Sequence, residues 1–160
     1  MTTRIPSLGP RGEGWVILQF ILLGLLVVVP FWAGGAWDRE ARWVTTLIGG
    51  LLALGGGALA GAGLLHLGES LTPLPHPRDG SRLVETGAYR IVRHPIYGGI
   101  ILGSFGWGLL TASPAAIGIA AAILVFFRLK SGREEAWLRT RYAGYEAYAT
   151  RTRRLVPLLY

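Results

Sequence analysis

The chain has 160 residues, of which 51% are hydrophobic and 16% are charged, and its formal net charge is +7. This composition is too apolar for an ordinary soluble domain and predicts one integral membrane domain over residues 1–160. The absence of cysteine excludes disulfides, thiolate nucleophiles and cysteine metal sites, and we expect no metal site. The positive charge would suit nucleic acid or an anionic membrane surface. Because the basic residues border apolar stretches, we favour the membrane and expect no nucleic-acid partner.

The first apolar stretch covers 15–33 and has Gln19 as its only strongly polar side chain. As an α-helix it would be about 28 Å long, enough to cross the hydrocarbon core of a bilayer. Pro30 lies near its end and is expected to kink or end the helix. The stretch has no small-residue cleavage site and further apolar stretches follow it, so we expect it to stay in the mature protein.

The second apolar stretch covers 43–67 and would be about 37 Å long if fully helical, which implies a tilted or frayed helix. Gly57 and Gly61 have the small-xxx-small spacing of closely packed membrane helices, and Gly99 and Gly103 repeat this spacing later in the chain. We interpret these glycines as helix-packing positions and not as a phosphate-binding loop.

The third and fourth spans are predicted at 96–112 and 114–129. Ser113 has the character of an N-cap, and Pro114 suits the first position of a helix. So short a turn makes the two spans an antiparallel hairpin. The start of the third span and the end of the fourth therefore meet at the same face of the membrane.

Two polar segments lie at that face. Residues 68–95 form a long loop that three closely spaced prolines stiffen into an extended crossing, and a loop of this kind is typical of a functional site. The C-terminal segment is 130–160. Its residues Ser131 and Glu134 have capping-box spacing, which predicts a separate amphipathic interfacial helix that begins at Ser131 and ends near Gly144, before a basic tail.

The distribution of positive charge predicts the orientation. Thirteen of the sixteen Lys and Arg residues lie in the N-terminal segment, the long loop and the C-terminal segment, a fourteenth, Arg128, lies at the adjoining end of the fourth span, and two lie in the link between the first two spans. By the positive-inside rule, both termini and the long loop are cytoplasmic. The fold class is therefore an all-α integral membrane protein with four transmembrane helices and a cytoplasmic, amphipathic C-terminal segment.

Several groups that could bind one ligand converge at this cytoplasmic interface. Pro95 would begin the third span and leave unpaired backbone amides beside Arg93 and His94, which is a typical anion site. Glu134 and Glu135 would lie opposite and could accept hydrogen bonds from sugar hydroxyls. The aromatic side chains that could stack on a base or attract a positive centre are those of Tyr89, Tyr97, Trp137 and Tyr148. A ligand with a carboxylate, a ribose, an adenine and a sulfonium, such as S-adenosylmethionine, matches this set.

Two alternatives remain at this point. A nicotinamide-dependent membrane reductase of similar helical design could use the same basic face for a pyrophosphate. A non-enzymatic membrane protein could use Arg93 and His94 as a juxtamembrane anchor, Glu134 as a helix cap and the tyrosines as an interfacial belt, and bind anionic lipid through its basic tail. Glu135 is the residue that this last alternative explains least well, although an ion pair with Arg139 would suffice.

Four segments resemble the isoprenylcysteine carboxyl methyltransferase family and the related phospholipid methyltransferases. They are Leu83–Gly99, which contains an RHPxYxG motif, Glu134–Leu138, which contains EExxL, Tyr145–Tyr148 and Arg154–Pro157. The resemblance covers about the last half of the chain. It implies a membrane-embedded, S-adenosylmethionine-dependent methyltransferase whose cofactor is enclosed by the third span, the fourth span and the C-terminal segment.

The resemblance also implies roles for individual residues. The cofactor-binding residues would be Tyr89, Arg93, His94, Pro95, Tyr97, Gly99, Glu134, Glu135 and Leu138. Tyr148 and Arg154 would close the substrate end. As catalytic residues, Arg154 would hold an anionic nucleophile, and Glu135 would accept a proton from an amine or hydroxyl nucleophile.

The expected acceptor is a lipophilic small molecule or lipid. Transfer to a carboxylate oxygen is favoured, while isoprenoid thioethers, fatty acids, phospholipid amines and small hydrophobic compounds stay open, as does the oligomeric state. The pattern makes one geometric prediction: Tyr97 and Glu135 face a single cavity on the cytoplasmic side.

Overall fold

The structure is a computed structural model that describes residues 8–68, 72, 74 and 82–157. Within these residues every regular element is helical, and the one pairing of strand type is an isolated bridge between Val92 and Arg153. The helices are α1 (Glu13–Val28), α2 (Pro30–Ala33), α3 (Arg39–Leu67), η2 (Gly87–Arg90, a 3₁₀-helix), α4 (Pro95–Leu110), α5 (Pro114–Arg141) and α6 (Tyr145–Arg151).

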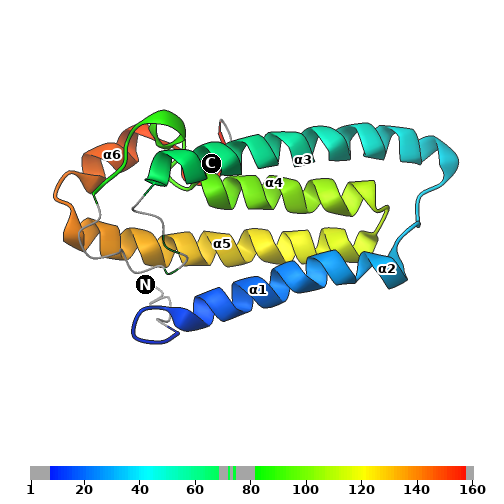
Figure 1. The fold of residues 1–160 in the computed structure, drawn as a ribbon, viewed down its shortest axis with the longest axis horizontal. Coiled ribbons are helices and arrows are strands. Elements are labelled where there is room, and N and C mark those ends of the chain that lie inside the picture. Colours follow the sequence, from blue (N-terminus) through cyan, green and yellow to red (C-terminus); the bar gives the residue numbers. More distant parts are fainter. Residues whose placement is uncertain (1–7, 69–71, 73, 75–81, 158–160) are drawn as a thin grey trace.

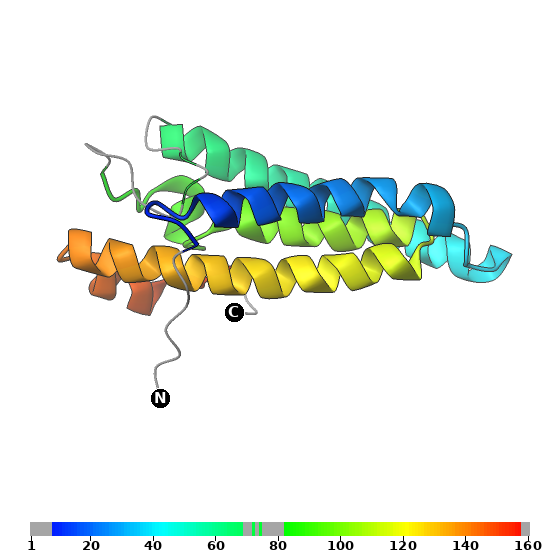
Figure 2. The same cartoon turned by 90° about the horizontal axis from the view of Figure 1, so that it is seen from below.

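The long helices lie side by side in a single bundle (Figures 1 and 2). α4 packs between α3 and α5, and α1 packs against α5. α6 and η2 lie at the end of the bundle where α3 and α5 finish and α4 begins (Figure 1). The long loop and the C-terminal segment are therefore brought to the same end, as the predicted hairpin requires.

Three helical segments are long and apolar enough to cross a membrane: Glu13–Ala33, α3 and α5. α4, where the third span was predicted at 96–112, is an apolar helix of 16 residues, or about 24 Å. The prediction of an all-α integral membrane protein is confirmed, whereas the count of four spans and the orientation stay predictions.

Most of the predicted helix ends have the expected cause. α1 ends at Val28 and α2 begins at Pro30, so that the first helix is interrupted at the proline, as expected. Ser113 caps α5 by accepting a hydrogen bond from the Ala116 amide at 3.2 Å. The second span was predicted to begin at residue 43, but α3 begins four residues earlier because Asp38 accepts a hydrogen bond from the Ala41 amide at 2.7 Å and acts as its N-cap.

The predicted helix start at Ser131 is wrong, because α5 runs without a break from Pro114 to Arg141. The Ser131 hydroxyl donates to the Arg128 carbonyl at 3.1 Å and caps nothing. Gly144 precedes α6 and does not end the helix before it. At 28 residues, α5 is about 42 Å long and projects beyond a hydrocarbon core of about 30 Å. A rigid helical platform therefore carries the EExxL motif.

Glycines form the contact between α3 and α4, as predicted, but the small-xxx-small spacing does not identify which α3 glycines lie in it. A Cβ atom at Gly56 would lie 2.5 Å from the Gly99 carbonyl oxygen, and one at Gly106 would lie 2.7 Å from the Ala53 amide. The α3 glycines on this seam recur every seven residues, at positions 49, 56 and 63. This heptad spacing is that of helices that cross at a shallow angle.

Gly57 and Gly61 lie outside this contact, since a Cβ atom on either would meet open space. Their small-xxx-small spacing is present in the sequence but faces away from α4. The other pair with this spacing lies in the contact, because the Gly99 carbonyl oxygen and the Gly103 amide nitrogen are 2.5 Å and 2.7 Å from the Cβ position of Gly56.

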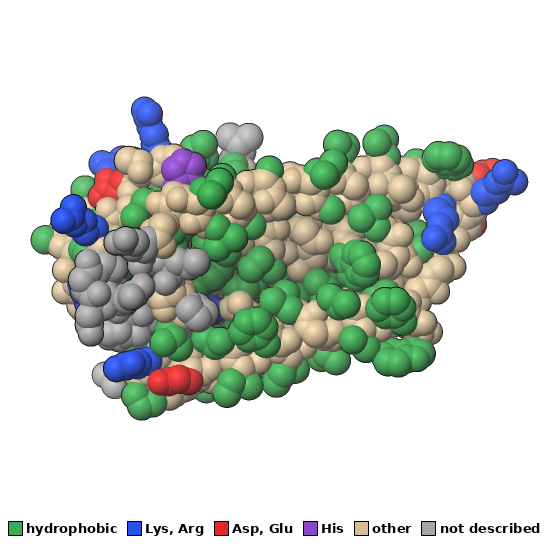
Figure 3. Space-filling model, viewed as in Figure 1, with side chains coloured by type: hydrophobic (Ala, Val, Ile, Leu, Met, Phe, Trp, Pro, Cys, Tyr) green, Lys and Arg blue, Asp and Glu red, His purple; other side chains and the backbone are tan. Residues whose placement is uncertain are grey.

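The surface of the bundle is consistent with a bilayer. Figure 3 shows charged side chains at the two ends and hydrophobic ones over the helices between them. Large side chains such as Phe20 and Leu65 are 62% and 84% exposed. A band of exposed apolar side chains bounded by charge on both sides is the pattern expected of helices in contact with lipid tails.

Candidate active site

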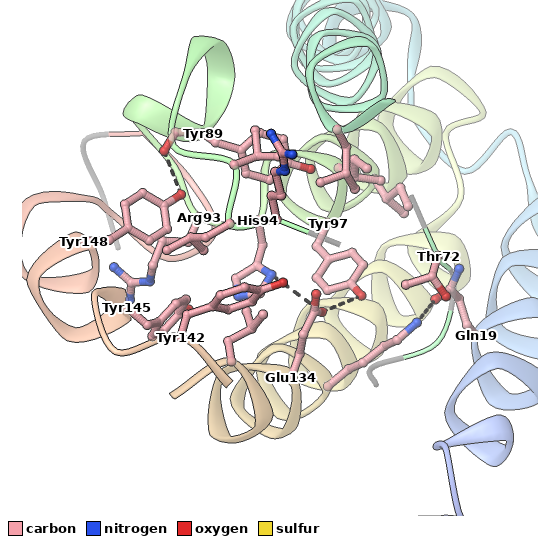
Figure 4. Close-up of a pocket in the computed structure, with 18 residues that line it drawn as sticks. Gln19, Thr72, Tyr89, Arg93, His94, Tyr97, Glu134, Tyr142, Tyr145 and Tyr148 are labelled. Atoms are coloured by element: carbon pink, nitrogen blue, oxygen red, sulfur yellow. Dashed lines mark hydrogen bonds and ion pairs between the residues drawn. The ribbon is translucent and has the colours of Figure 1, made fainter. Parts of the chain in front are cut away.

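A cavity of about 280 Å³ lies at the end of the bundle where α4 begins (Figure 4). Its walls come from α1, the end of α3, the long loop, η2, α4, α5 and α6. The lining residues are Gln19, Leu67, Thr72, Arg82, Leu83, Val84, Tyr89, Arg93, His94, Ile96, Tyr97, Ile100, Lys130, Glu134, Leu138, Tyr142, Tyr145 and Tyr148.

The start of α4 places His94 between two carboxylates. His94 precedes Pro95, which occupies the first turn of the helix. The His94 Nδ1 atom lies 3.8 Å from Glu134 Oε2, and Nε2 lies 3.3 Å from Glu135 Oε1. The imidazole ring also stacks on Tyr97, with ring centroids 5.3 Å apart. The RHPxYxG and EExxL motifs are therefore in direct contact.

Tyr97 and Glu134 form a second link between the motifs. The Tyr97 hydroxyl donates to Glu134 Oε2 at 2.9 Å (Figure 4). On its other side the Tyr97 ring stacks on Phe127 of α5, with centroids 4.6 Å apart. These contacts hold the phenol and the carboxylate in place at the wall of the cavity.

Glu135 binds several cations and lies behind the wall. Its side chain is 1% exposed. Arg93 Nε donates to Oε1 at 2.9 Å, and Arg154 donates to the two carboxylate oxygens through Nε at 3.1 Å and Nη2 at 2.8 Å. Arg139 lies one helical turn further on, at 3.5 Å. A buried carboxylate is retained when it is paired and hydrogen-bonded in this way.

Backbone hydrogen bonds bring the C-terminal segment to the same place. The Arg93 amide donates to the Arg153 carbonyl at 2.8 Å, the His94 amide donates to the Arg154 carbonyl at 3.0 Å, and the Arg153 amide donates to the Ile91 carbonyl at 3.0 Å. The glycine at position 98 leaves room for the Leu155 carbonyl. This short ladder fixes Arg154 beside Glu135.

Tyrosines line the end of the cavity next to α6. The Tyr148 hydroxyl donates to the Tyr89 carbonyl at 2.7 Å. Burial raises the pKa of Tyr89, and Glu134 raises it further; burial also raises the pKa of Tyr148. Both phenols are therefore neutral at physiological pH.

Tyr145 differs from its neighbours. Its side chain is 1% exposed and lines the cavity, yet no hydrogen-bond partner for its hydroxyl is found among the described residues. A buried hydroxyl without a partner costs free energy. A ligand in the cavity would remove that cost by accepting or donating one hydrogen bond.

The structure brings most of the predicted site residues to the cavity. Those that line it are Tyr89, Arg93, His94, Tyr97, Glu134, Leu138 and Tyr148. Pro95 and Gly99 face α3, where they approach Gly63 and Ala60. Glu135 and Arg154 bind each other behind the wall, so Tyr97 faces the cavity as predicted and Glu135 does not. The functional roles of all these residues stay predictions.

Several lining residues had no predicted role in the site, among them Gln19, Lys130, Tyr142 and Tyr145. Three of them carried a signal. Gln19 is the single strongly polar residue of the first apolar stretch, and Tyr145 begins one of the segments that resemble the methyltransferases. For Lys130 the signal was its position directly after a long apolar run.

The fold and the site define a helical membrane protein with a cavity at one end of its bundle that polar and apolar side chains line together. The family model described as phospholipid methyltransferase matches residues 44–144, and the chain belongs to this family. The resemblance that the motifs indicated is therefore confirmed.

Curated proteins that are similar to the chain carry different names. The chain is 31% identical over 147 residues to a cobalt-zinc-cadmium resistance protein, CzcN, of Cupriavidus metallidurans, covering 90% of the chain and 62% of that protein. It is 30% identical over 124 residues to protein-S-isoprenylcysteine O-methyltransferase B of Arabidopsis thaliana, covering 75% and 63%. A probable protein-S-isoprenylcysteine O-methyltransferase of Oryza sativa is 28% identical over 128 residues, covering 76% and 66%. The chain thus spans just under two thirds of the length of these relatives.

Proposed function

We propose that the chain is a membrane methyltransferase that uses S-adenosylmethionine to methylate a lipophilic acceptor. The observation that carries this proposal is the cavity in which His94 and Tyr97 of one motif meet Glu134 of the other. Membership of the phospholipid methyltransferase family and the names of the plant relatives support the same reaction class.

The cavity residues fit the cofactor chemically. The Glu134 carboxylate can accept hydrogen bonds from ribose hydroxyls, and the unpartnered Tyr145 hydroxyl can bind a polar group of the ligand. The faces of the lining tyrosines can stack on adenine and attract a sulfonium centre. When bound, S-adenosylmethionine would supply an activated methyl group.

The residues of the chain would contribute by position more than by proton transfer. Methyl transfer is an in-line displacement, which depends on alignment and on the exclusion of water. Tyr97 and Glu134 hold each other rigidly at the wall, and the apolar side chains of Leu67, Ile96 and Ile100 keep that part of the cavity dry.

The geometry favours a revised role for the two residues predicted to be catalytic. Arg154 directs two of its nitrogen atoms at Glu135, and Glu135 also binds Arg93 and His94. The guanidinium groups of Arg93 and Arg154 favour the ionised form of the Glu135 carboxylate. We therefore assign Glu135 and Arg154 a positioning role, holding the start of α4 and the C-terminal segment around the cavity.

The acceptor and the side of the membrane are part of the proposal. An acceptor with a carboxylate on an isoprenoid- or lipid-like chain would agree with the names of the plant relatives. In the sequence, the segments that precede α1, connect α3 to α4 and follow the apolar part of α5 carry fourteen of the sixteen Lys and Arg residues, which favours a cytoplasmic location for the cavity.

Binding of the reaction product tests the proposal directly. In detergent, S-adenosylhomocysteine at 100 times its Kd should stabilise the protein by about 2.7 kcal/mol, which is measurable as a rise in the thermal midpoint. NADPH is the matched control, since a reductase would respond to it instead. Stabilisation by NADPH alone, or by neither nucleotide, would contradict the proposal. Transfer of labelled methyl to a membrane lipid extract would then identify the acceptor.

A further inference from the structure

Lys130 turns into the bundle instead of outward. Its side chain is 0% exposed, and its Nζ donates to Gln19 Oε1 of α1 at 2.5 Å. Nζ also lies 5.2 Å from the centre of the Tyr97 ring. A lysine at the edge of a membrane span ordinarily extends its ammonium to water or lipid headgroups. Lys130 therefore does not act as an interfacial anchor.

α5 is apolar up to Phe127, and α1 is apolar on both sides of Gln19. α5 has no charged residue from Pro114 to Phe127, and Gln19 is the only strongly polar side chain in residues 15–33. Lys130 and Gln19 nevertheless both line the cavity. Ionisable groups in such surroundings usually face a cavity and mark the path of a substrate or ion.

The two ends of the cavity differ in character. Figure 4 shows Tyr145 and Tyr148 on one side and Gln19 and Thr72 on the other, with Tyr97 and Glu134 between them. The aromatic end suits an adenosyl group. Ile96 and Ile100 also line the cavity, so that it offers apolar contacts to a lipid-like molecule as well.

Resting on the methyltransferase function proposed above, we propose that Lys130 and Gln19 form a subsite for an anionic oxygen group, a carboxylate or a phosphate, of a membrane-borne acceptor. The ammonium would donate a charge-assisted hydrogen bond to that group. Because Gln19 Oε1 accepts from Lys130, its Nε2 is left to donate a second one. This subsite takes over the anion-binding role that the sequence assigned to Arg154, which binds Glu135 instead.

The test compares amphiphiles that differ in charge. Oleate, dioleoyl phosphatidate and the neutral oleyl alcohol would be titrated into the protein in a neutral detergent that contains saturating S-adenosylhomocysteine. We expect at least one anionic amphiphile to bind ten times or more tightly than oleyl alcohol. Lys130→Met should reduce that ratio to within about twofold, and Lys130→Arg should retain most of it. The oleate and phosphatidate arms show whether a carboxylate or a phosphate is preferred.

Matched variants keep the test decisive. Arg128→Met removes an exposed charge from the same helix and should leave the ratio unchanged. If Lys130→Met does not fold, Gln19→Glu places a carboxylate beside the ammonium and should abolish the preference. Equal binding of charged and neutral amphiphiles by the wild type, or an equal loss in Arg128→Met, would overturn the subsite. Failure to bind S-adenosylhomocysteine would instead count against the proposed function, and the two failures are therefore distinguishable.

Discussion

Tyr145 and Tyr148 lie one turn apart on α6, and their hydroxyls differ in a way that can be measured. Removal of the unpartnered hydroxyl by Tyr145→Phe should leave the free energy of unfolding unchanged or slightly higher. The same change should weaken S-adenosylhomocysteine binding by about 2- to 10-fold, since a hydrogen bond is worth roughly 0.5–1.5 kcal/mol. Calorimetry in detergent would measure the affinity.

Tyr148→Phe is the matched control, because it removes the hydrogen bond to the Tyr89 carbonyl. It should lower the free energy of unfolding by about 1 kcal/mol. Unchanged affinity in Tyr145→Phe would show that the hydroxyl does not contact the cofactor.

Glu135 gives a second prediction for a single residue. Glu135→Gln leaves the guanidinium groups of Arg93 and Arg154 without their charged partner and should lower the free energy of unfolding by about 2–4 kcal/mol. The C-terminal segment, which these contacts hold, should become cleavable by protease before the bundle unfolds. Glu146→Gln is the control, since Glu146 is 71% exposed and its pair with Arg139 should contribute less than about 1 kcal/mol. Equal stability of the two variants would contradict the structural role of Glu135.

The sequence could assign both glutamates to the site but could not distinguish them. Successive residues on a helix point about 100° apart, so that the two side chains must face different surroundings. Which of them faces the cavity depends on how α5 is rotated in the bundle, and this is fixed by the packing of buried residues such as Ile123 and Phe127. Glu134 therefore meets Tyr97, and Glu135 meets the arginines.

At the scale of the helices, the contact between α3 and α4 can be tested with two neighbouring glycines. Gly56→Ala would place a methyl group 2.5 Å from the Gly99 carbonyl oxygen, and it should lower the free energy of unfolding by about 1–3 kcal/mol. Gly57→Ala adds the same methyl group in open space and should be neutral or stabilising by up to about 1 kcal/mol. Thermal unfolding in detergent would compare them. A larger loss of stability in Gly57→Ala than in Gly56→Ala would contradict the glycine contact between α3 and α4.

The helices were more predictable than their ends. The apolar runs, Pro30 and the Ser113–Pro114 turn each depend on local chemistry, and the structure has each feature where it was expected. The start at Ser131 was wrong because capping-box residues are also compatible with the interior of a helix, where the hydroxyl bonds to a carbonyl of the preceding turn. The sequence predicted that glycines pack the helices but not which of them face α4, because a spacing of seven shows its role only once a partner helix is in place.

At the scale of the molecule, the hairpin of α4 and α5 explains how the site is assembled. It brings the RHPxYxG and EExxL motifs, 37 residues apart at Tyr97 and Glu134, into hydrogen-bond contact. That much followed from the sequence. The contribution of α1 did not, because nothing in the sequence places Gln19 beside Lys130, and the cavity is only closed on that side by the packing of α1 on α5.

The orientation of the whole molecule can be tested because the chain has no cysteine of its own. Single cysteines at Glu146 and at Arg42 would lie at opposite ends of the bundle, and both side chains are exposed. The excess of Lys and Arg at the cavity end predicts that a membrane-impermeant maleimide labels Glu146→Cys in inside-out vesicles and Arg42→Cys in intact spheroplasts. The reverse pattern would place the cavity on the outer side, where a cytoplasmic supply of S-adenosylmethionine could not reach it. Labelling of both sites from one side would show that an even number of membrane crossings separates Arg42 from Glu146, and would rule out α3, α4 and α5 as three consecutive spans.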